Sequence, residues 1–203
     1  MLAAGADVVT LGNHVWRQRD LIPVLRENVR VIRPANLRGP GTGLAVAHAE
    51  DGTPVAVINL QGALFLDVAV HPFVVVDDLV EEARARAKVI LVDFHAEATS
   101  EKVALARHLD GRVTAVIGTH THVQTNDARV QPRGTAAITD AGMTGPHDSV
   151  IGVDAHLAIE RMRTGMPVRF KPAEGDVRIE GALVECDPQT GLATSCEPVR
   201  VRV

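Results

Sequence analysis

The strongest constraint on the fold is an unbroken apolar run, Val89-Ile90-Leu91-Val92. Consecutive β-branched and leucine residues are typical of a strand that is covered on both faces, as in a sheet packed between other layers. A second apolar run, Val113 to Ile117, predicts another buried strand that Gly118 closes. Together with the helical segments between the strands, these runs favour an α/β fold.

The rest of the chain predicts alternating strands and helices. We predict strands at residues 7–11, 44–49, 55–60 and 136–139, the middle two joined as a hairpin through Asp51-Gly52. We predict helices at residues 20–25, 79–87, 154–162 and up to Leu109, with Thr99 or Ser100 capping the last of these. Residues 65–76 are expected to form a surface loop, and segments at 168–170, 177–186 and 192–203 an antiparallel meander. No repeat or linker divides the chain, so a single domain over residues 1–203 is expected.

Size and charge narrow the classes of function. A chain of 203 residues can build one substantial core. Its net charge is −4 and its basic residues are scattered, which argues against duplex nucleic acid as a partner. Aromatic residues make up only 2%, which disfavours a stacking platform for single strands. No apolar segment approaches the roughly 20 residues that cross a bilayer, and no secretory leader is recognisable, so we predict a cytoplasmic protein without a membrane partner.

The two cysteines, Cys186 and Cys196, flank a turn-rich stretch and could face each other across a hairpin. Two cysteines in a cytosolic chain of this length do not make a disulfide framework, so we expect reduced thiols.

Potential ligands follow the predicted strands at three places. Asn13-His14 comes after the first strand, His95 follows the run at residues 89–92, and His120 and His122 follow Gly118. Ligands bind beyond the carboxyl ends of strands in open α/β sheets, and imidazole is the commonest side-chain ligand for metals such as zinc. The three strand ends therefore predict one metal site. The alternatives are that Asn13 caps a turn and that the histidines are ordinary loop or core residues.

Two of these segments resemble known motifs. Gly12-Asn13-His14 and Gly118-Thr119-His120-Thr121-His122 resemble the G-N-H and G-H-x-H motifs of calcineurin-like metallophosphoesterases. The YmdB-type branch is similar over nearly the whole chain, including residues 33–36, 58–62, 94–102, 118–125 and 139–145.

The resemblance implies a metallophosphoesterase-type sandwich of β-sheets flanked by helices. It implies an enzyme that hydrolyses phosphodiesters such as 2′,3′-cyclic nucleotides through a metal-bridging hydroxide. The cofactor would be two divalent or mixed-valence metal ions, iron or manganese first and zinc as a further option. Matched by motif, Asn13, His95, His120 and His122 would be metal ligands, and His14 would protonate or stabilise the leaving oxygen. Two cations lower the pKa of a bridging water, and an imidazole can protonate an alkoxide, so the chemistry is coherent.

Residues beside these motifs have supporting roles in this interpretation. Asp93 shares a strand face with His95 and would orient an imidazole ring. Glu97, Lys102 and Thr121 would orient groups or contact phosphate, or else start a helix and line a loop. The remaining histidines have no matching partners and are expected on the surface: His48, His71, His108, His147 and His156.

The chain departs from the family at its beginning. Family members open with one strand ending in aspartate and another ending in Asn-Gly-Glu-Asn, and this chain has neither. We therefore expect an N-terminally truncated fold. Its exposed sheet edges would favour a homo-oligomer. The remaining ligands are neutral and would balance the positive charge of two cations poorly. Activity of the chain as given is then in question. The alternatives are a catalytically silent metal- or nucleotide-binding regulatory protein and a hydrolase with one metal on His95, His120 and His122.

Overall fold

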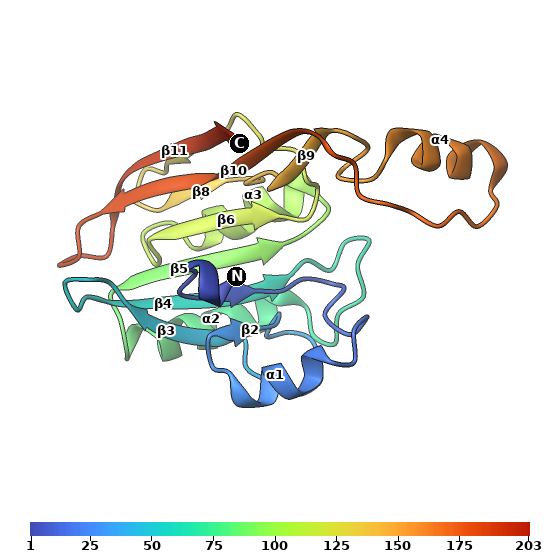
Figure 1. The fold of residues 1–203 in the computed structure, drawn as a ribbon. Helices are drawn as coiled ribbons and strands as arrows, with labels where there is room; N and C mark the ends of the chain where they lie inside the picture. The colour runs from blue at the N-terminus through green and yellow to red at the C-terminus, as the bar shows by residue number, and fades with distance from the viewer.

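A computed structural model describes residues 1–203, and a six-stranded sheet lies at its centre (Figure 1). The strands lie in the order β3 (Leu44–His48), β4 (Pro54–Gln61), β5 (Val89–His95), β6 (Ala115–Thr119), β8 (Ala136–Ile138) and β7 (Arg129–Val130). The inner strands β4, β5, β6 and β8 are parallel, and the edge strands β3 and β7 are antiparallel to their neighbours. The carboxyl ends of the parallel strands therefore meet at one edge.

Two helices cover one face of this sheet: α2 (Pro72–Arg84) and α3 (Thr99–His108) (Figure 1). Val76 and Val80 of α2 and Leu105 of α3 are fully buried in the main core, against Ile90 and Val92 of β5. The strand alternation that places Ile90 and Val92 toward the helices turns Leu91 to the opposite face.

A second sheet packs on that opposite face. It consists of β9 (Gly145–Asp148), β10 (Gly175–Cys186) and β11 (Ala193–Arg202), and all its neighbouring strands are antiparallel. Val184 and Cys196 pack against a small cluster formed by Ala115, Ala136 and Ala193, which joins the two sheets. The predicted sandwich of β-sheets flanked by helices is confirmed.

The N-terminal part contributes a short 3-10 turn (Leu2–Ala4), β1 (Val9–Thr10), α1 (Leu21–Glu27) and β2 (Val31–Ile32). Strands β1 and β2 form a parallel pair of their own. Helix α4 (Ala155–Thr164) stands away from the body on an arm between β9 and β10 (Figure 1). Asp154 caps α4 by accepting hydrogen bonds from the backbone N–H groups of His156 and Leu157.

Several local predictions were wrong. Helix α2 begins at Pro72, inside the segment predicted as a loop, because proline lacks only an N–H group that the first helical turn leaves unpaired. Thr99 is the first residue of α3 and makes no capping hydrogen bond, because the cap position falls on Ala98. Residues 168–170 form no strand, and the short strands β2, β7 and β9 were not predicted.

Two predictions about single side chains can also be judged. Cys186 and Cys196 are free, as expected, but the β10–β11 register places Cys196 opposite Val184 rather than opposite Cys186. His147 is not a surface residue: its side chain is largely buried, and its Nε2 atom lies 3.2 Å from Glu180 Oε2.

Candidate functional site

Strand β5 carries His95 to the edge where the parallel strands end. His95 is the last residue of β5 and lies in register with Gln61 of β4 and Thr119 of β6. Side chains alternate along a strand, so Asp93 and His95 point to the same face. The site is therefore built on a central strand of the sheet, and pairing with β4 and β6 fixes the position of His95.

Three atoms with lone pairs that could bind a metal ion come together at this point from distant segments of the chain. We call them the donor cluster. His95 Nε2 lies 3.0 Å from Asn13 Oδ1 and 3.1 Å from His120 Nδ1. Asn13 belongs to the loop after β1, and His120 directly follows β6. The rings of His95 and His120 meet edge to face, with 4.7 Å between their centroids. The structure thus brings Asn13, His95 and His120 together as the sequence predicted.

Neighbouring groups determine which ring nitrogens carry protons. Thr119 Oγ1 donates a hydrogen bond to Asp93 Oδ1 at 2.8 Å, so it accepts from His95 Nδ1 at 3.1 Å. His120 Nε2 faces Glu97 Oε2 at 3.0 Å, and a carboxylate only accepts. His95 Nε2 therefore keeps its lone pair, and it faces Asn13 Oδ1 and His120 Nδ1. Electron-rich atoms in such contact form a site that a cation would stabilise.

The electrostatics of the site keep His95 neutral. Burial lowers the pKa of His95 to about 4, and the nearby charges of His120 and Lys102 act in the same direction. Burial raises the pKa of Asp93 to about 6, although hydrogen bonds from Thr10 and Thr119 oppose the shift. A neutral imidazole is the form that binds a metal.

His14 and His122 lie near this cluster without joining it. The pKa of His14 is lowered, first by partial burial and then by the charges of Arg17, His120 and His122. No hydrogen bond connects His14 or His122 to the three donor atoms. No group of three or more His, Cys, Asp or Glu side chains is arranged to hold a metal ion. The metal-ligand roles of Asn13, His95, His120 and His122 and the catalytic role of His14 stay predictions.

A buried ion pair supports the loop that carries the two histidines. Asp140 Oδ2 lies 2.8 Å from Lys102 Nζ, and both side chains are almost completely buried. The same oxygen accepts hydrogen bonds from the backbone N–H and the hydroxyl of Thr121, between His120 and His122. The sequence prediction assigned no role to Asp140, although it follows a short apolar run just as the other polar residues of the site do.

A glycine permits the closest approach in the site. A Cβ atom on Gly12 would lie 2.3 Å from His95 Nε2 and 2.4 Å from His95 Cε1. Only a residue without a side chain lets the backbone before Asn13 pass the face of this imidazole. Gly12 therefore sets the position of both Asn13 and His95.

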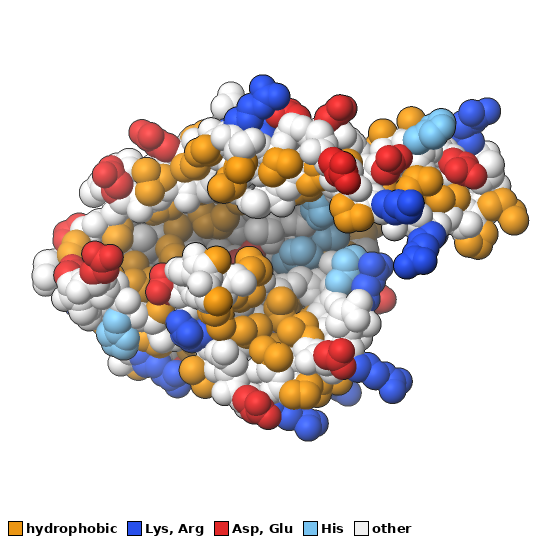
Figure 2. All heavy atoms as spheres, viewed as in Figure 1, with side chains coloured by type: hydrophobic (Ala, Val, Ile, Leu, Met, Phe, Trp, Pro, Cys, Tyr) orange, Lys and Arg blue, Asp and Glu red, His pale blue; other side chains and the backbone are white.

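The site opens into a hollow of the surface. Pale-blue histidine side chains line this hollow in Figure 2, between the N-terminal part and the C-terminal sheet. A neighbouring cleft of about 500 Å³ separates residues 6–10 from the sheet face opposite α2 and α3, and Asp93 and Thr119 line it. The cleft therefore reaches the two residues that fix the His95 ring through its Nδ1 atom.

Comparison with known proteins agrees with this architecture. The family described as YmdB-like protein matches residues 1–199. The 2′,3′-cyclic-nucleotide 2′-phosphodiesterase of Bacillus subtilis is 45% identical over 203 residues, which cover 99% of this chain and 76% of the relative. A putative phosphatase/phosphodiesterase of Mycoplasma genitalium is 37% identical over 98% of this chain and 73% of the relative.

Solved structures of related proteins share this fold. A hypothetical protein from Thermus thermophilus superimposes with a TM-score of 0.90 and 39% identity, covering 99% of this chain and 78% of that one. A novel phosphatase from Mycoplasma pneumoniae gives a TM-score of 0.87 and 33% identity, covering 99% and 74%. Fold and similarity together define a hydrolase of the phosphoesterase class. Within that class, the chain belongs to the YmdB-like family. None of its helices is long and apolar enough to cross a membrane.

Proposed function

We propose that the protein is a metal-dependent phosphodiesterase that opens the cyclic diester of 2′,3′-cyclic nucleotides. The observation that carries this proposal is that His95 Nε2 lies 3.0 Å from Asn13 Oδ1 and 3.1 Å from His120 Nδ1, with the His95 lone pair directed into the cluster. The activity in the name of the Bacillus subtilis relative supports the choice of substrate.

The donor atoms fit a divalent cation of borderline softness. Imidazole nitrogens suit iron and zinc, and an amide oxygen also suits manganese. We propose that Asn13, His95 and His120 hold one cation and that His122 contributes to a second. When bound, such ions supply a water of lowered pKa and positive charge beside the phosphoryl oxygens. The chain itself supplies imidazole rings whose orientation Thr119 and Glu97 fix.

His14 has the position of a proton donor in this scheme. It follows Asn13 directly, is solvent-exposed, and lies close enough to His120 and His122 for their charges to affect its pKa. We propose that the His14 imidazole donates a proton or a hydrogen bond to the oxygen that leaves phosphorus. Only one P–O bond breaks in a cyclic diester, so one donor at that oxygen suffices.

The proposal is tested with chelator-treated protein to which Mn²⁺ or Fe²⁺ is returned. We expect hydrolysis of 2′,3′-cyclic AMP to appear with the metal and to disappear again with EDTA. His95→Ala should abolish metal-dependent turnover, and His14→Ala should lower kcat by about 100- to 10,000-fold, the usual contribution of a general acid. His48→Ala, which changes an exposed histidine at the far end of β3, is the control and should keep full activity.

Other outcomes would support the alternatives. Binding of 2′,3′-cyclic AMP without turnover at any metal concentration would refute the proposal and favour a silent regulatory protein. One tightly bound ion per chain with no phosphodiester turnover would favour the single-metal hydrolase. A homo-oligomer, a single domain and a cytoplasmic location stay predictions from the sequence.

A further inference from the structure

An aromatic side chain stands in solvent beside the site. Phe65 is 86% exposed, the largest exposed fraction among the large hydrophobic residues of the chain. It lies on the loop between β4 and α2, and no hydrophobic cluster includes it. Burying a phenylalanine stabilises a fold by about 1.5–3 kcal/mol, so a fully displayed ring contributes nothing comparable to stability.

The backbone holds Phe65 in an unfavourable conformation. Its φ angle is 66°, in the left-handed region that favours glycine. A bulky residue keeps such a conformation only where the surrounding structure imposes it.

Buried polar groups impose that conformation on the loop. The buried carboxylate of Glu101 on α3 accepts hydrogen bonds from the backbone N–H groups of Ala63 at 2.8 Å and Leu64 at 3.3 Å. Gln61 Nε2 donates to the carbonyl of Asp67 at 2.8 Å and ties the two sides of the loop together. The loop is thus fixed on both sides of Phe65, and the ring is presented on a rigid support.

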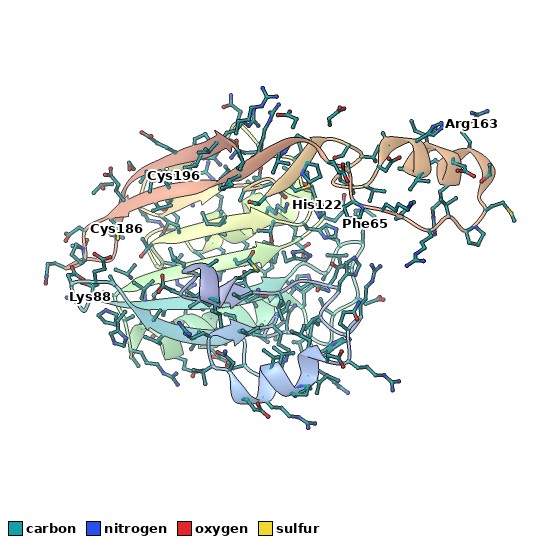
Figure 3. All side chains as sticks on the ribbon, viewed as in Figure 1. Phe65, Lys88, His122, Arg163, Cys186 and Cys196 are labelled. Atoms are coloured by element: carbon teal, nitrogen blue, oxygen red, sulfur yellow. The ribbon has the colours of Figure 1, made fainter.

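The loop begins at the donor cluster. The N–H group of Gly62 donates a hydrogen bond of 3.0 Å to the carbonyl of His95. Phe65 is three residues further, so its Cα atom lies within about 11 Å of that of Gly62. Figure 3 shows Phe65 and His122 on the same side of the molecule, beyond the ends of the parallel strands. The loop therefore carries Phe65 to the same edge of the molecule as the histidines.

We propose that Phe65 is a specificity residue that stacks on the base of the nucleotide substrate; this rests on the proposed function. A phenyl face accepts any nucleobase, so the contact selects nucleoside cyclic phosphates over other cyclic phosphodiesters without selecting one base. The low aromatic content argues against a platform for a strand of bases, but one ring suffices for one base.

The test compares two substrates that share the reacting ring. 2′,3′-Cyclic AMP carries a base, whereas glycerol 1,2-cyclic phosphate has the same five-membered cyclic diester without one. With Mn²⁺ supplied, we expect Phe65→Ala to raise KM for 2′,3′-cyclic AMP about 5- to 150-fold, the range of a lost base–aromatic stack, with kcat nearly unchanged. KM for glycerol 1,2-cyclic phosphate should not change, and Phe65→Trp should restore the wild-type KM. Leu183→Ala, which truncates an exposed side chain on β10, is the control and should change neither substrate.

A binding experiment tests the stack separately from turnover. Titration calorimetry should show that Phe65→Ala weakens binding of 3′-AMP by the same factor and leaves binding of inorganic phosphate unchanged. If wild-type protein hydrolyses neither substrate, the proposed function fails, and the binding experiment still tests the stack. Equal losses for both substrates, or unchanged binding of 3′-AMP in Phe65→Ala, would overturn the assignment of Phe65.

Discussion

Replacing Gly12 by alanine tests whether the position of His95 depends on the missing side chain beside it. The added methyl group would lie 2.3 Å from Nε2, 2.4 Å from Cε1 and 2.7 Å from Cδ2 of His95, whereas ordinary contact begins at 3.4 Å. All three atoms belong to the far part of one imidazole ring. The φ angle of Gly12 is not in the left-handed region, so the backbone itself tolerates alanine. We expect the ring to move and the backbone to stay.

The size of the effect follows from the contacts that the ring would lose. Moving His95 breaks its contacts with Asn13 at 3.0 Å and Thr119 at 3.1 Å. Only the Thr119 contact is a hydrogen bond in this tautomer, and a hydrogen bond contributes about 0.5–1.5 kcal/mol, so Gly12→Ala should lower the free energy of unfolding by about that amount. A displacement of about 1 Å at a reacting centre costs about 100-fold in rate, so kcat/KM should fall at least that far.

The assay combines urea unfolding with kcat/KM for 2′,3′-cyclic AMP at saturating Mn²⁺. Gly181→Ala is a matched control, because a Cβ atom at Gly181 meets nothing within 4 Å. We expect Gly181→Ala to match the wild type in activity. A Gly12→Ala protein with wild-type kcat/KM would refute the reasoning, because it would show that the donor cluster does not depend on this close approach.

Three further predictions concern groups around the cluster. Lys102→Met leaves Asp140 buried without its cation and should lower the free energy of unfolding by about 3–5 kcal/mol in urea titrations; an unchanged midpoint would contradict this. Glu97→Ala frees His120 Nε2 and should weaken metal affinity about 10- to 100-fold in chelator competition, and unaltered affinity would show that Glu97 does not orient the ring. Burial would raise the pKa of Glu180, but contacts from a histidine, a backbone N–H and an arginine hold it below its ordinary 4.5. The carboxylate therefore stabilises the fold above about pH 4.5 and loses this effect as the pH falls through the lowered pKa, so Glu180→Gln should flatten the fall of stability below about pH 4.5.

The strands of the central sheet could be predicted because runs of consecutive apolar residues indicate buried strands. Val89 to Val92 form the first part of β5, and the Asp51-Gly52 turn joins β3 to β4 as expected. The start of α2 could not be predicted in the same way. Pro72 interrupts an apolar segment in the sequence, and only the fold shows that it occupies a first helical turn. Two-residue strands such as β2 carry too few residues to show any periodicity.

The candidate site was predictable only in part. The donors Asn13, His95 and His120 follow strands, and the rule for ligands at strand ends brought them together before the fold was known. The roles of Thr119 and Asp140 depend on hydrogen bonds between segments far apart in the sequence, which no local pattern specifies. Phe65 was missed because its exposure and its left-handed backbone are properties of the folded chain.

The long separation of the donors along the chain has a consequence for biosynthesis. Asn13 and His95 are 82 positions apart, and His95 and His120 are a further 25 apart. On the ribosome, a nascent chain cannot bring the three donor atoms together before residue 120 has left the exit tunnel and the strands between have paired. If the proposed cation binds here, its capture follows folding and cannot guide the early steps, so protein expressed without metal should fold and accept the ion afterwards.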